Sequence, residues 1–325
     1  MKKLSIIIPV YNVEKYIERC INSALNQDLS KDEYEIIVVD DESPDNSAVI
    51  IKEIQKKYDN IKLFSQKNKG LGGARNTGLK NAKGKYILFL DADDYLKENT
   101  LRKIYEISTK NDLDILEFGA VGITKNNKIV YTKILKTEHV LSGYSYLDKF
   151  FYMNSACNKL YKLDFLRINK LQFIEKIYIE DFEFNTKVFY YAKRVLATDY
   201  IVSYFFQSHN SITRNSNPQK NLKMVNDINF VINELILFKR QIDINNKVNR
   251  EVINERIGFL VVTLLYTLMK FRIDKDERDN IIKELKKNGV YPVKIVIRDK
   301  KKNIFKIFVN QTFLYKLGYN LHNFF

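Results

Sequence analysis

The sequence predicts an α/β protein with a mostly parallel sheet flanked by helices, followed by a mainly helical C-terminal region. Within the first 100 residues, four short runs rich in β-branched and aromatic residues alternate with segments of helical periodicity. Two of these runs end in clusters of aspartate, at VVDD and at FLDADD. Beyond about residue 221 the apolar residues recur at helical spacing.

The four strands of the first half follow one another at short intervals. We expect them in KLSIIIPVY, YEIIVVDDES, NIKLFSQ and KYILFLDADD. Helices are expected between them in NVEKYIERCINSALNQ, SAVIIKEIQKKY and GGARNTGLKNAKG. Asn12 is placed to cap the first helix, and Asp94 to cap a helix in YLKENTLRKIYEI. In such sheets ligands bind at the carboxyl ends of the strands, where both aspartate clusters lie.

The alternation loosens from about residue 112. Strands are expected in DLDILEFGAVGI, KIVYTKIL and LATDYIVSYFFQS, and a broken helix in SYLDKFFYMNSACNKLYKLDFLRIN. A helix with an acidic first turn is expected in IYIEDFEFNTKVFYYAKRV. We therefore expect one domain over 1–215, with halves of about 1–100 and 101–215, and a basic helical region over 216–325.

Composition narrows the classes of partner and location. Of the 325 residues 45% are hydrophobic, which favours a packed core, and the net charge is +15. Nucleic acid, an anionic membrane or acidic substrates such as sugar nucleotides could each match that charge. Residues 220–325 carry 21 lysines and arginines against 11 acids. Two cysteines indicate a reducing cytosol rather than a disulfide scaffold.

Two apolar segments bear on membrane insertion. The first apolar run is only about five residues long and ends at Pro9, which is shorter than a signal peptide requires. IGFLVVTLLYTLM, Ile257–Met269, is shorter than the ~18 residues of a membrane span. We expect it to form a buried helix or one that lies on a membrane surface.

The DADD cluster is the first candidate site. Asp91 and Asp93 follow a buried strand, and hard divalent cations prefer carboxylate oxygens while leaving positions for phosphate. A metal–diphosphate site and a solvated turn followed by an aspartate helix cap are equally compatible with this spacing alone.

Four further motifs each have a structural alternative. VVDDESPDNS could accept hydrogen bonds from a base or ribose, or could simply form a turn. In NKGLGGARNTGL the glycines could let the backbone approach a ligand closely while Arg75 offers it planar hydrogen-bond donors. The alternative is a flexible loop. The acids of YIEDFEF could supply a general base, or stabilise a helix N-terminus. His209 lacks the partners of a zinc site, and a lone histidine is more often structural.

Taken in order, these motifs resemble the family-2 glycosyltransferases, which adopt the GT-A fold with a Rossmann-like sheet. The resemblance rests on SIIIPVYNVEKYIERCINSALNQ, EIIVVDDESPDNS, NKGLGGARNTGLKNAKGKYILFLDADD and IEDFEF, and continues to about residue 213. It implies transfer of a sugar from a nucleotide diphosphate sugar, by analogy UDP-linked, to an acceptor hydroxyl with inversion. Glu42 stands where glycine is common in the family, so this turn is expected to be less free.

The resemblance also assigns residues. The implied nucleotide contacts are Pro9, Tyr11, Asn12, Glu14, Asp41, Arg75, Asp91 and Ala92. Asp93, with Asp91, is the implied ligand of Mn²⁺ or Mg²⁺. Asp181 matches the catalytic base, with Glu180 as second choice. Lys159 in ACNKLYKLDFL and His209 in SYFFQSHNSIT are further candidates.

The implied partners are the nucleotide-sugar donor and a glycan or lipid-linked saccharide acceptor of cell-surface polysaccharide synthesis. The basic C-terminal region suggests attachment to the inner face of the cell membrane, or alternatively a helical oligomerisation element. No nucleic-acid-binding motif is present, so that partner is not expected.

Two other functions remain open from the sequence. A haloacid-dehalogenase-type phosphohydrolase also has D-x-D after an apolar strand, but normally after the first strand, and followed by Thr or Val where this chain has Asp94. The second alternative is a non-catalytic binding or assembly protein that retains a transferase fold.

Overall fold

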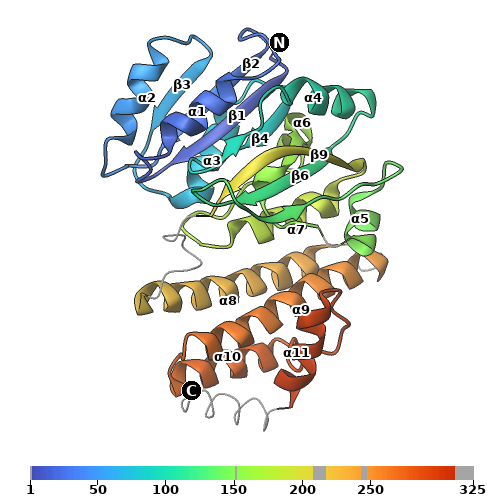
Figure 1. The fold of residues 1–325 in the computed structure, drawn as a ribbon. Helices are drawn as coiled ribbons and strands as arrows, with labels where there is room; N and C mark the ends of the chain where they lie inside the picture. Colours follow the sequence, from blue (N-terminus) through green and yellow to red (C-terminus); the bar gives the residue numbers. More distant parts are fainter. Residues whose placement is uncertain (1, 151, 208–216, 243–246, 312–325) are drawn as a thin grey trace. The chain divides into compact units, whose positions relative to one another are not determined.

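The computed structural model describes residues 2–150, 152–207, 217–242 and 247–311, with side chains from 251 in the last range. The chain forms two compact units, residues 1–211 and 212–325. The first unit is α/β and the second is helical (Figure 1). His209 lies outside the described residues, so its predicted role stays a prediction.

A nine-stranded sheet organises the first unit, and its first half is parallel as predicted. The four strands are β1 (Leu4–Val10), β2 (Tyr34–Asp40), β3 (Ile61–Ser65) and β4 (Tyr86–Phe89), in the spatial order β3-β2-β1-β4. Val10 pairs with Asp40, so the carboxyl ends of β1 and β2 meet at one edge of the sheet. Every residue of β1, β2 and β4 is buried, which explains their continuous apolar runs.

The second half makes the sheet mixed rather than mostly parallel. It contains β5 (Tyr95–Leu96), β6 (Ile115–Ile123), β7 (Ile129–Lys133), β8 (Lys159–Lys162) and β9 (Val195–Phe206). β8 runs antiparallel to both β4 and β6, whereas β6 and β9 are parallel. β6, β7 and β9 were predicted. β8 was expected inside a broken helix, because its KLYK sequence is too short to carry a strand pattern.

The helices of the first unit cover the sheet on both faces. They are α1 (Ile17–Leu25), α2 (Ser47–Gln55), α3 (Gly70–Asn81), α4 (Leu101–Lys110), α5 (Gly143–Lys149), α6 (Leu163–Ile168) and α7 (Glu180–Tyr191), with a short 3₁₀ turn at Ala156–Asn158. One core cluster joins the sheet to α1, α2 and α4.

Two predicted helix caps were wrong. Asn12 lies in a left-handed turn with φ of 56°, and α1 begins only at Ile17. Asp94 is followed by the short strand β5, and its carboxylate instead accepts a hydrogen bond of 2.7 Å from the Phe206 N–H. For Asp94 a tertiary contact takes the carboxylate that a local pattern had assigned to a helix, whereas Asn12 lies in a turn five residues before the helix begins.

The second unit consists of four described helices. They are α8 (Pro218–Gln241), α9 (Lys247–Lys270), α10 (Lys275–Lys287) and α11 (Lys300–Asn310). Asn217 and Asp274 cap α8 and α10 through their side-chain oxygens. The second unit packs α8 and α11 against α9, the most apolar of these helices.

Helix α9 is longer than the apolar run Ile257–Met269, which alone was judged too short to span a membrane. Residues Glu251–Lys270 are long and apolar enough to cross a membrane, because a few polar residues are tolerated within the helix. In the apolar 18-residue window of this segment 67% is buried, as is usual for the core helix of a soluble protein. By length and composition alone the helix is weak evidence for a membrane span.

Helix α3 packs closely on β1 because Gly78 has no side chain. A Cβ at this position would lie 2.3 Å from Ile7 Cγ2. We expect Gly78→Ala to lower the free energy of unfolding by about 1–3 kcal/mol through overpacking, despite the better helix propensity of alanine. Denaturant unfolding measures the change. Lys80→Ala, at an exposed position of the same helix, is the control and should change stability by less than about 0.5 kcal/mol. Equal stability of both variants would contradict this packing.

Candidate active site

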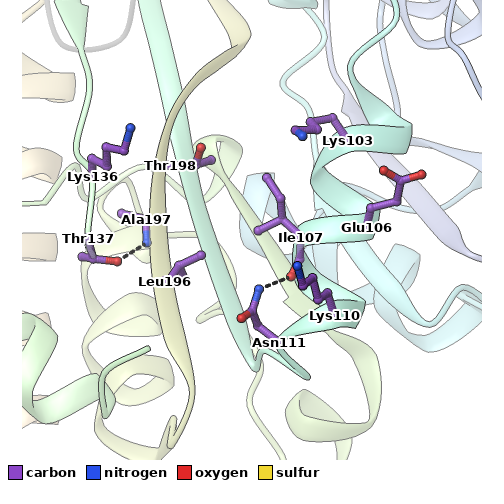
Figure 2. Close-up of a pocket in the computed structure, with 10 residues that line it drawn as sticks. All are labelled: Lys103, Glu106, Ile107, Lys110, Asn111, Lys136, Thr137, Leu196, Ala197 and Thr198. Carbon is purple, nitrogen blue, oxygen red and sulfur yellow. Dashed lines mark hydrogen bonds between the residues drawn. The ribbon is translucent and has the colours of Figure 1, made fainter. Parts of the chain in front are cut away.

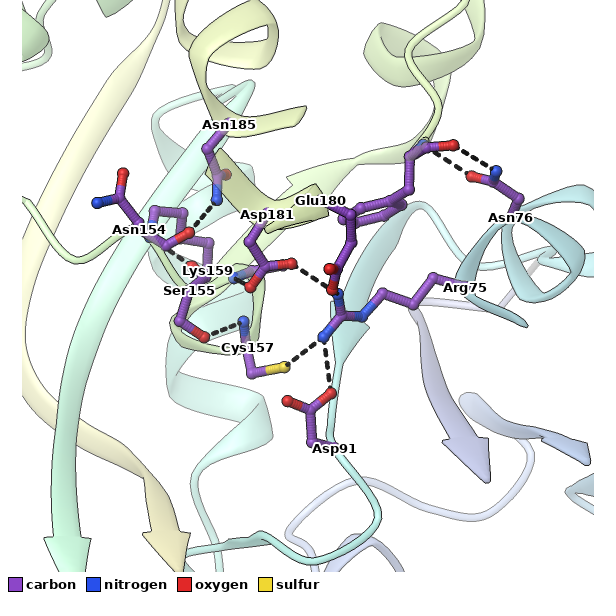
Figure 3. A network of polar contacts seen from close by, with 12 residues as sticks. Arg75, Asn76, Asp91, Asn154, Ser155, Cys157, Lys159, Glu180, Asp181 and Asn185 are labelled. Carbon is purple, nitrogen blue, oxygen red and sulfur yellow. Dashed lines mark hydrogen bonds and ion pairs between the residues drawn. The ribbon is translucent and has the colours of Figure 1, made fainter. Parts of the chain in front are cut away.

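The side chain of Arg75 joins three carboxylates from separate parts of the first unit (Figure 3). Its Nη1 donates to Glu180 Oε1 at 2.7 Å and to Asp181 Oδ1 at 2.6 Å, and its Nη2 donates to Asp91 Oδ1 at 2.7 Å. Only 1% of the arginine side chain is exposed. The D-x-D motif and the E-D motif, 90 residues apart in the sequence, therefore meet on one guanidinium.

Glycines at the start of α3 allow this meeting. A Cβ on Gly72 would lie 2.3 Å from the Ile174 carbonyl oxygen, so the first turn of α3 packs directly on the backbone that leads to α7. Below the guanidinium lies the ring of Phe173, 5.1 Å from the Arg75 Cζ. Phe173 in turn stacks on Phe184 of α7 at 3.8 Å between ring centroids. An apolar floor thus excludes water from one side of the cluster.

Burial and mutual repulsion raise the pKa values of the E-D pair. Burial, then the charge of Asp181, raise the pKa of Glu180 to about 8, and Arg75 opposes them. Burial also raises the pKa of Asp181, against the lowering effect of Arg75. Glu180 Oε2 is buried and has no hydrogen-bond partner in the described part of the chain, which disfavours the charged form of this carboxyl group. Asp181 has 23% of its side chain exposed and is the more accessible of the two.

The segment between α5 and β8 holds the other oxygen of Asp181. The Ala156 N–H donates to Asp181 Oδ2 at 2.9 Å. Cys157, a buried free thiol, lies 3.8 Å from Arg75 Nη2. The carboxylate of Asp181 is therefore fixed from two sides, which is the arrangement expected of a group that must receive a proton at a defined position.

Lys159, one of the predicted further candidates, is fully buried behind this segment. Its Nζ donates to the Met153 and Ser155 carbonyl oxygens at 2.6 and 2.8 Å and to Asn158 Oδ1 at 2.7 Å. Glu117 Oε2 lies 3.8 Å from the same nitrogen. Lys159 acts on the site indirectly, because it fixes the backbone whose N–H holds Asp181.

The three acids of DADD have three different environments. Asp91 is held by Arg75, and Asp94 accepts from the Phe206 N–H. Asp93 receives no hydrogen bond from another side chain among the described residues, and Arg19 bonds only its backbone oxygen. Burial, then the charge of Asp91, raise the pKa of Asp93 to about 6. A bound cation would relieve both effects.

These residues fit a divalent cation that is shared with a phosphate ligand. No cluster of three or more histidine, cysteine or acidic side chains suited to a metal occurs in the described part of the chain. Mg²⁺ and Mn²⁺ need fewer protein ligands when substrate phosphates complete their coordination. Asp93, to which no side chain donates among the described residues, could supply one oxygen to such a cation, and Asp91 lies two residues before it.

Most of the residues predicted to contact the nucleotide lie near the carboxyl ends of β1, β2 and β4, and Arg75 lies in α3. Pro9 is in β1, Tyr11 is 53% exposed just beyond it, and Ala92 is buried within the DADD turn. Asp41 Oδ1 accepts from Gln66 Nε2 at 2.6 Å and from the Lys69 N–H at 2.9 Å.

The turns beside this edge are fixed by further polar contacts. Glu14 Oε2 accepts from the Asn46 N–H and side chain, both at 3.1 Å. The Asn12 N–H donates to Ser43 Oγ at 3.3 Å. Glu42 adopts a left-handed φ of 65°, which is uncommon for a non-glycine residue and is the backbone conformation that favours glycine.

Some residues near the site were not predicted. Arg19 lies beside the D-x-D turn, with its guanidinium 4.7 Å from the ring of Tyr95 and 4.6 Å from that of Phe206. Cys157 and the Ala156 N–H also escaped prediction, since neither residue type signals such a role. The ERC segment of the first helix carried no motif that could have identified Arg19.

A cavity of about 500 Å³ lies elsewhere in the first unit, between α4 and β9 (Figure 2). Lys103, Lys110 and Lys136 line it around an apolar floor that includes Ile107 and Leu196. None of the predicted site residues borders this cavity, so the carboxylate cluster and the cavity are separate features.

Comparison with known proteins identifies related chains. The model of glycosyl transferase family 2 matches residues 5–166. A poly(ribitol-phosphate) β-N-acetylglucosaminyltransferase, TarP of Staphylococcus aureus, is 31% identical over 252 residues, 74% of this chain and 75% of TarP. A poly(ribitol-phosphate) β-glucosyltransferase of Bacillus spizizenii is 36% identical over 202 residues, 61% of this chain but only 31% of that protein.

The fold is shared with solved structures. The crystal structure of residues 1–349 of S. aureus TarS in complex with UDP-GlcNAc superposes with a TM-score of 0.72 at 22% identity, covering 99% of this chain and 91% of that chain. The match extends over both units and confirms the predicted fold class with its C-terminal helical region. Neither the phosphohydrolase nor the non-catalytic alternative is supported by these relatives.

The pH dependence of stability tests the state of Glu180. Its pKa is about 8 in the folded protein against an ordinary value of 4.5, so between these pH values only the folded state keeps the proton. Raising the pH through this window therefore favours unfolding, by up to about 1.4 kcal/mol per pH unit. We expect Glu180→Gln to remove this slope. Denaturant unfolding from pH 5 to pH 8 measures it, with Glu18→Gln, exposed on α1, as the control. Parallel pH profiles for Glu180→Gln and the unaltered protein would contradict the assignment.

Proposed function

Because this chain belongs to glycosyl transferase family 2, we propose that it transfers a hexose from a UDP-linked sugar to an acceptor hydroxyl in cell-surface polysaccharide synthesis. The observation that carries the proposal is the cluster in which Arg75 joins Asp91 of the D-x-D motif to Glu180 and Asp181. The proposed metal–diphosphate residues and the proposed general base thus adjoin, which supports transfer from a nucleotide sugar.

Asp181 is the proposed general base. One carboxylate oxygen is held by the Ala156 N–H and the other by Arg75, while the side chain stays partly exposed. Its raised pKa improves its capacity to accept the proton of an acceptor hydroxyl. The deprotonated oxygen then attacks the anomeric carbon from the face opposite the diphosphate, which inverts the configuration. The ionised Arg75 stabilises the carboxylate form of Asp181 before the transfer.

Asp93, with Asp91, is the proposed site of Mn²⁺ or Mg²⁺. A cation bound there would neutralise the charge that develops on the diphosphate leaving group. Asp91 keeps one oxygen on Arg75 and presents its carboxylate with 31% of the side chain exposed. Asp41, Tyr11 and Glu14, which lie just beyond the carboxyl ends of β2 and β1, are the proposed contacts of the base and ribose.

The proposed donor and acceptor follow from the relatives. TarS was crystallised with UDP-GlcNAc, and the named activities of TarP and the Bacillus spizizenii protein use poly(ribitol-phosphate). We propose UDP-GlcNAc or UDP-glucose as the donor, and a polyol-phosphate polymer, glycan or lipid-linked saccharide as the acceptor.

The proposed place of action is the cytoplasmic side of the cell membrane, with the enzyme bound peripherally. Such acceptors are often assembled on lipid carriers, and residues 220–325 hold about two thirds of the net charge of +15. Oligomerisation through the C-terminal region is the alternative use of that unit.

Asp181→Asn should lower kcat by about 10²–10⁴ because the base is lost while the shape is kept. Glu180→Gln should lower it at most about tenfold, since Gln resembles the protonated Glu180. Release of UDP from UDP-GlcNAc or UDP-glucose, with poly(ribitol-phosphate) and Mn²⁺ present, measures both rates. A larger loss for Glu180→Gln than for Asp181→Asn would assign the base to Glu180 instead.

Removal of divalent metal should abolish transfer, and Mn²⁺ or Mg²⁺ should restore it. Asp93→Asn should weaken the Mn²⁺-dependent binding of UDP, seen by calorimetry, by at least about tenfold because its carboxylate is the unpaired ligand. Asp199→Asn, in an exposed ion pair with Lys136, is the control and should bind as the unaltered protein does. Full activity in excess chelator would exclude the proposed metal dependence.

A further inference from the structure

Helix α11 has two faces of opposite character. Lys302, Phe305 and Val309 share one face, at spacings of three and four residues. That face is fixed to the rest of the second unit: Lys302 Nζ donates to Thr263 Oγ1 at 2.5 Å, and the Tyr291 hydroxyl donates to the Val309 carbonyl oxygen at 2.6 Å. The helix is therefore rigidly mounted on α9 and on the segment that precedes it.

The opposite face carries aliphatic side chains in solvent. Ile304 is 69% exposed and Ile307 is 63% exposed. Lys300 lies on the same face, four and seven residues before them, and Lys301 is exposed beside it. Isolated exposed aliphatics are common on protein surfaces, but a pair flanked by lysines on one helical face is the pattern of an interfacial membrane helix.

We propose that this face of α11, formed by Lys300, Lys301, Ile304 and Ile307, docks on an anionic lipid bilayer. The inference rests on the membrane location proposed above and names the surface by which the protein attaches to the membrane. The two isoleucines enter the boundary between headgroups and acyl chains, and the lysines contact lipid phosphates. Shallow insertion of this kind needs no membrane-spanning helix.

The lysines of this face favour an anionic bilayer over the two other candidates for binding it, a second copy of the chain and the segment 312–325. A second copy of the chain would place lysines against lysines, which is repulsive. The segment 312–325, TFLYKLGYNLHNFF, is rich in apolar residues but contains one lysine and no acid, so by composition it complements the isoleucines and not the lysines. An anionic lipid surface matches both the apolar and the cationic parts of the face.

Flotation with vesicles tests the proposal on the full chain. We expect it to float with vesicles of phosphatidylglycerol and phosphatidylcholine, and not with phosphatidylcholine alone. The double variant Ile304→Glu/Ile307→Glu should lower the vesicle partition coefficient at least about tenfold. Lys300→Gln/Lys301→Gln should lower it roughly 10- to 30-fold at low salt. Ile168→Glu, at a position that is 79% exposed on α6 of the first unit, is the matched control and should bind normally.

Three results would overturn the proposal. The first is no binding to anionic vesicles, and the second is binding that is unchanged in the isoleucine variant. The third is a different occupant. If the isoleucine variant abolishes a concentration-dependent dimer, the face belongs to a second copy of the chain. If that variant shows a marked loss of thermal stability, another part of the same chain covers the face. UDP-sugar turnover without vesicles should be equal in all variants, so a failure of the proposed reaction is detected separately.

Discussion

The first unit depends on one constraint: a guanidinium that is almost completely buried must be paired with carboxylates, and those carboxylates come from distant segments. An unpaired buried charge costs several kcal/mol, so Arg75 fixes the relative positions of α3, the end of β4 and the start of α7. The same pairing brings an excess of negative charge into a small volume. Protonation of Glu180, whose pKa is about 8, relieves part of that excess. The cluster is thus held together by attraction to Arg75 and limited by repulsion among the acids.

This constraint explains why the parallel and antiparallel halves of the sheet belong to one site. The parallel half ends its strands at one edge and supplies the D-x-D turn and the residues beside the predicted nucleotide position. The antiparallel strand β8 follows the turn that carries the Ala156 N–H, and that N–H is the second support of Asp181. Lys159 begins β8 and holds the carbonyl oxygens of the preceding segment. A change of strand direction therefore places a rigid backbone donor opposite the arginine.

The sequence predicted the parts of the structure whose signal is local. β1, β2 and β4 were recognisable because fully buried parallel strands are continuous apolar runs. β8 was missed because its four residues include two lysines, one of them buried by partners that no local pattern reveals. The cap at Asp94 was wrong because the Phe206 N–H, 112 residues away, takes its carboxylate. The cap at Asn12 was wrong because a left-handed turn, whose N–H donates to Ser43 31 residues away, delays the start of α1 to Ile17. Arg75 was placed at the nucleotide by resemblance. Its hydrogen bonds here are to Asp91 and, 105 and 106 residues away, to Glu180 and Asp181.

The three neighbouring acids of DADD illustrate how tertiary contacts divide identical residues among different tasks. Asp94 is buried against the end of β9, and burial followed by the charge of Asp93 raises its pKa well above the ordinary value. It serves the fold by accepting a hydrogen bond from the Phe206 N–H. Asp91 is neutralised by Arg75 and so is tied to the E-D pair. Asp93 is the member of the triplet without a side-chain donor among the described residues. A cation at this turn would thus meet the available carboxylate of Asp93 and that of Asp91, whose charge is already paired with Arg75. Most of its coordination would then be left to the phosphates of a bound substrate.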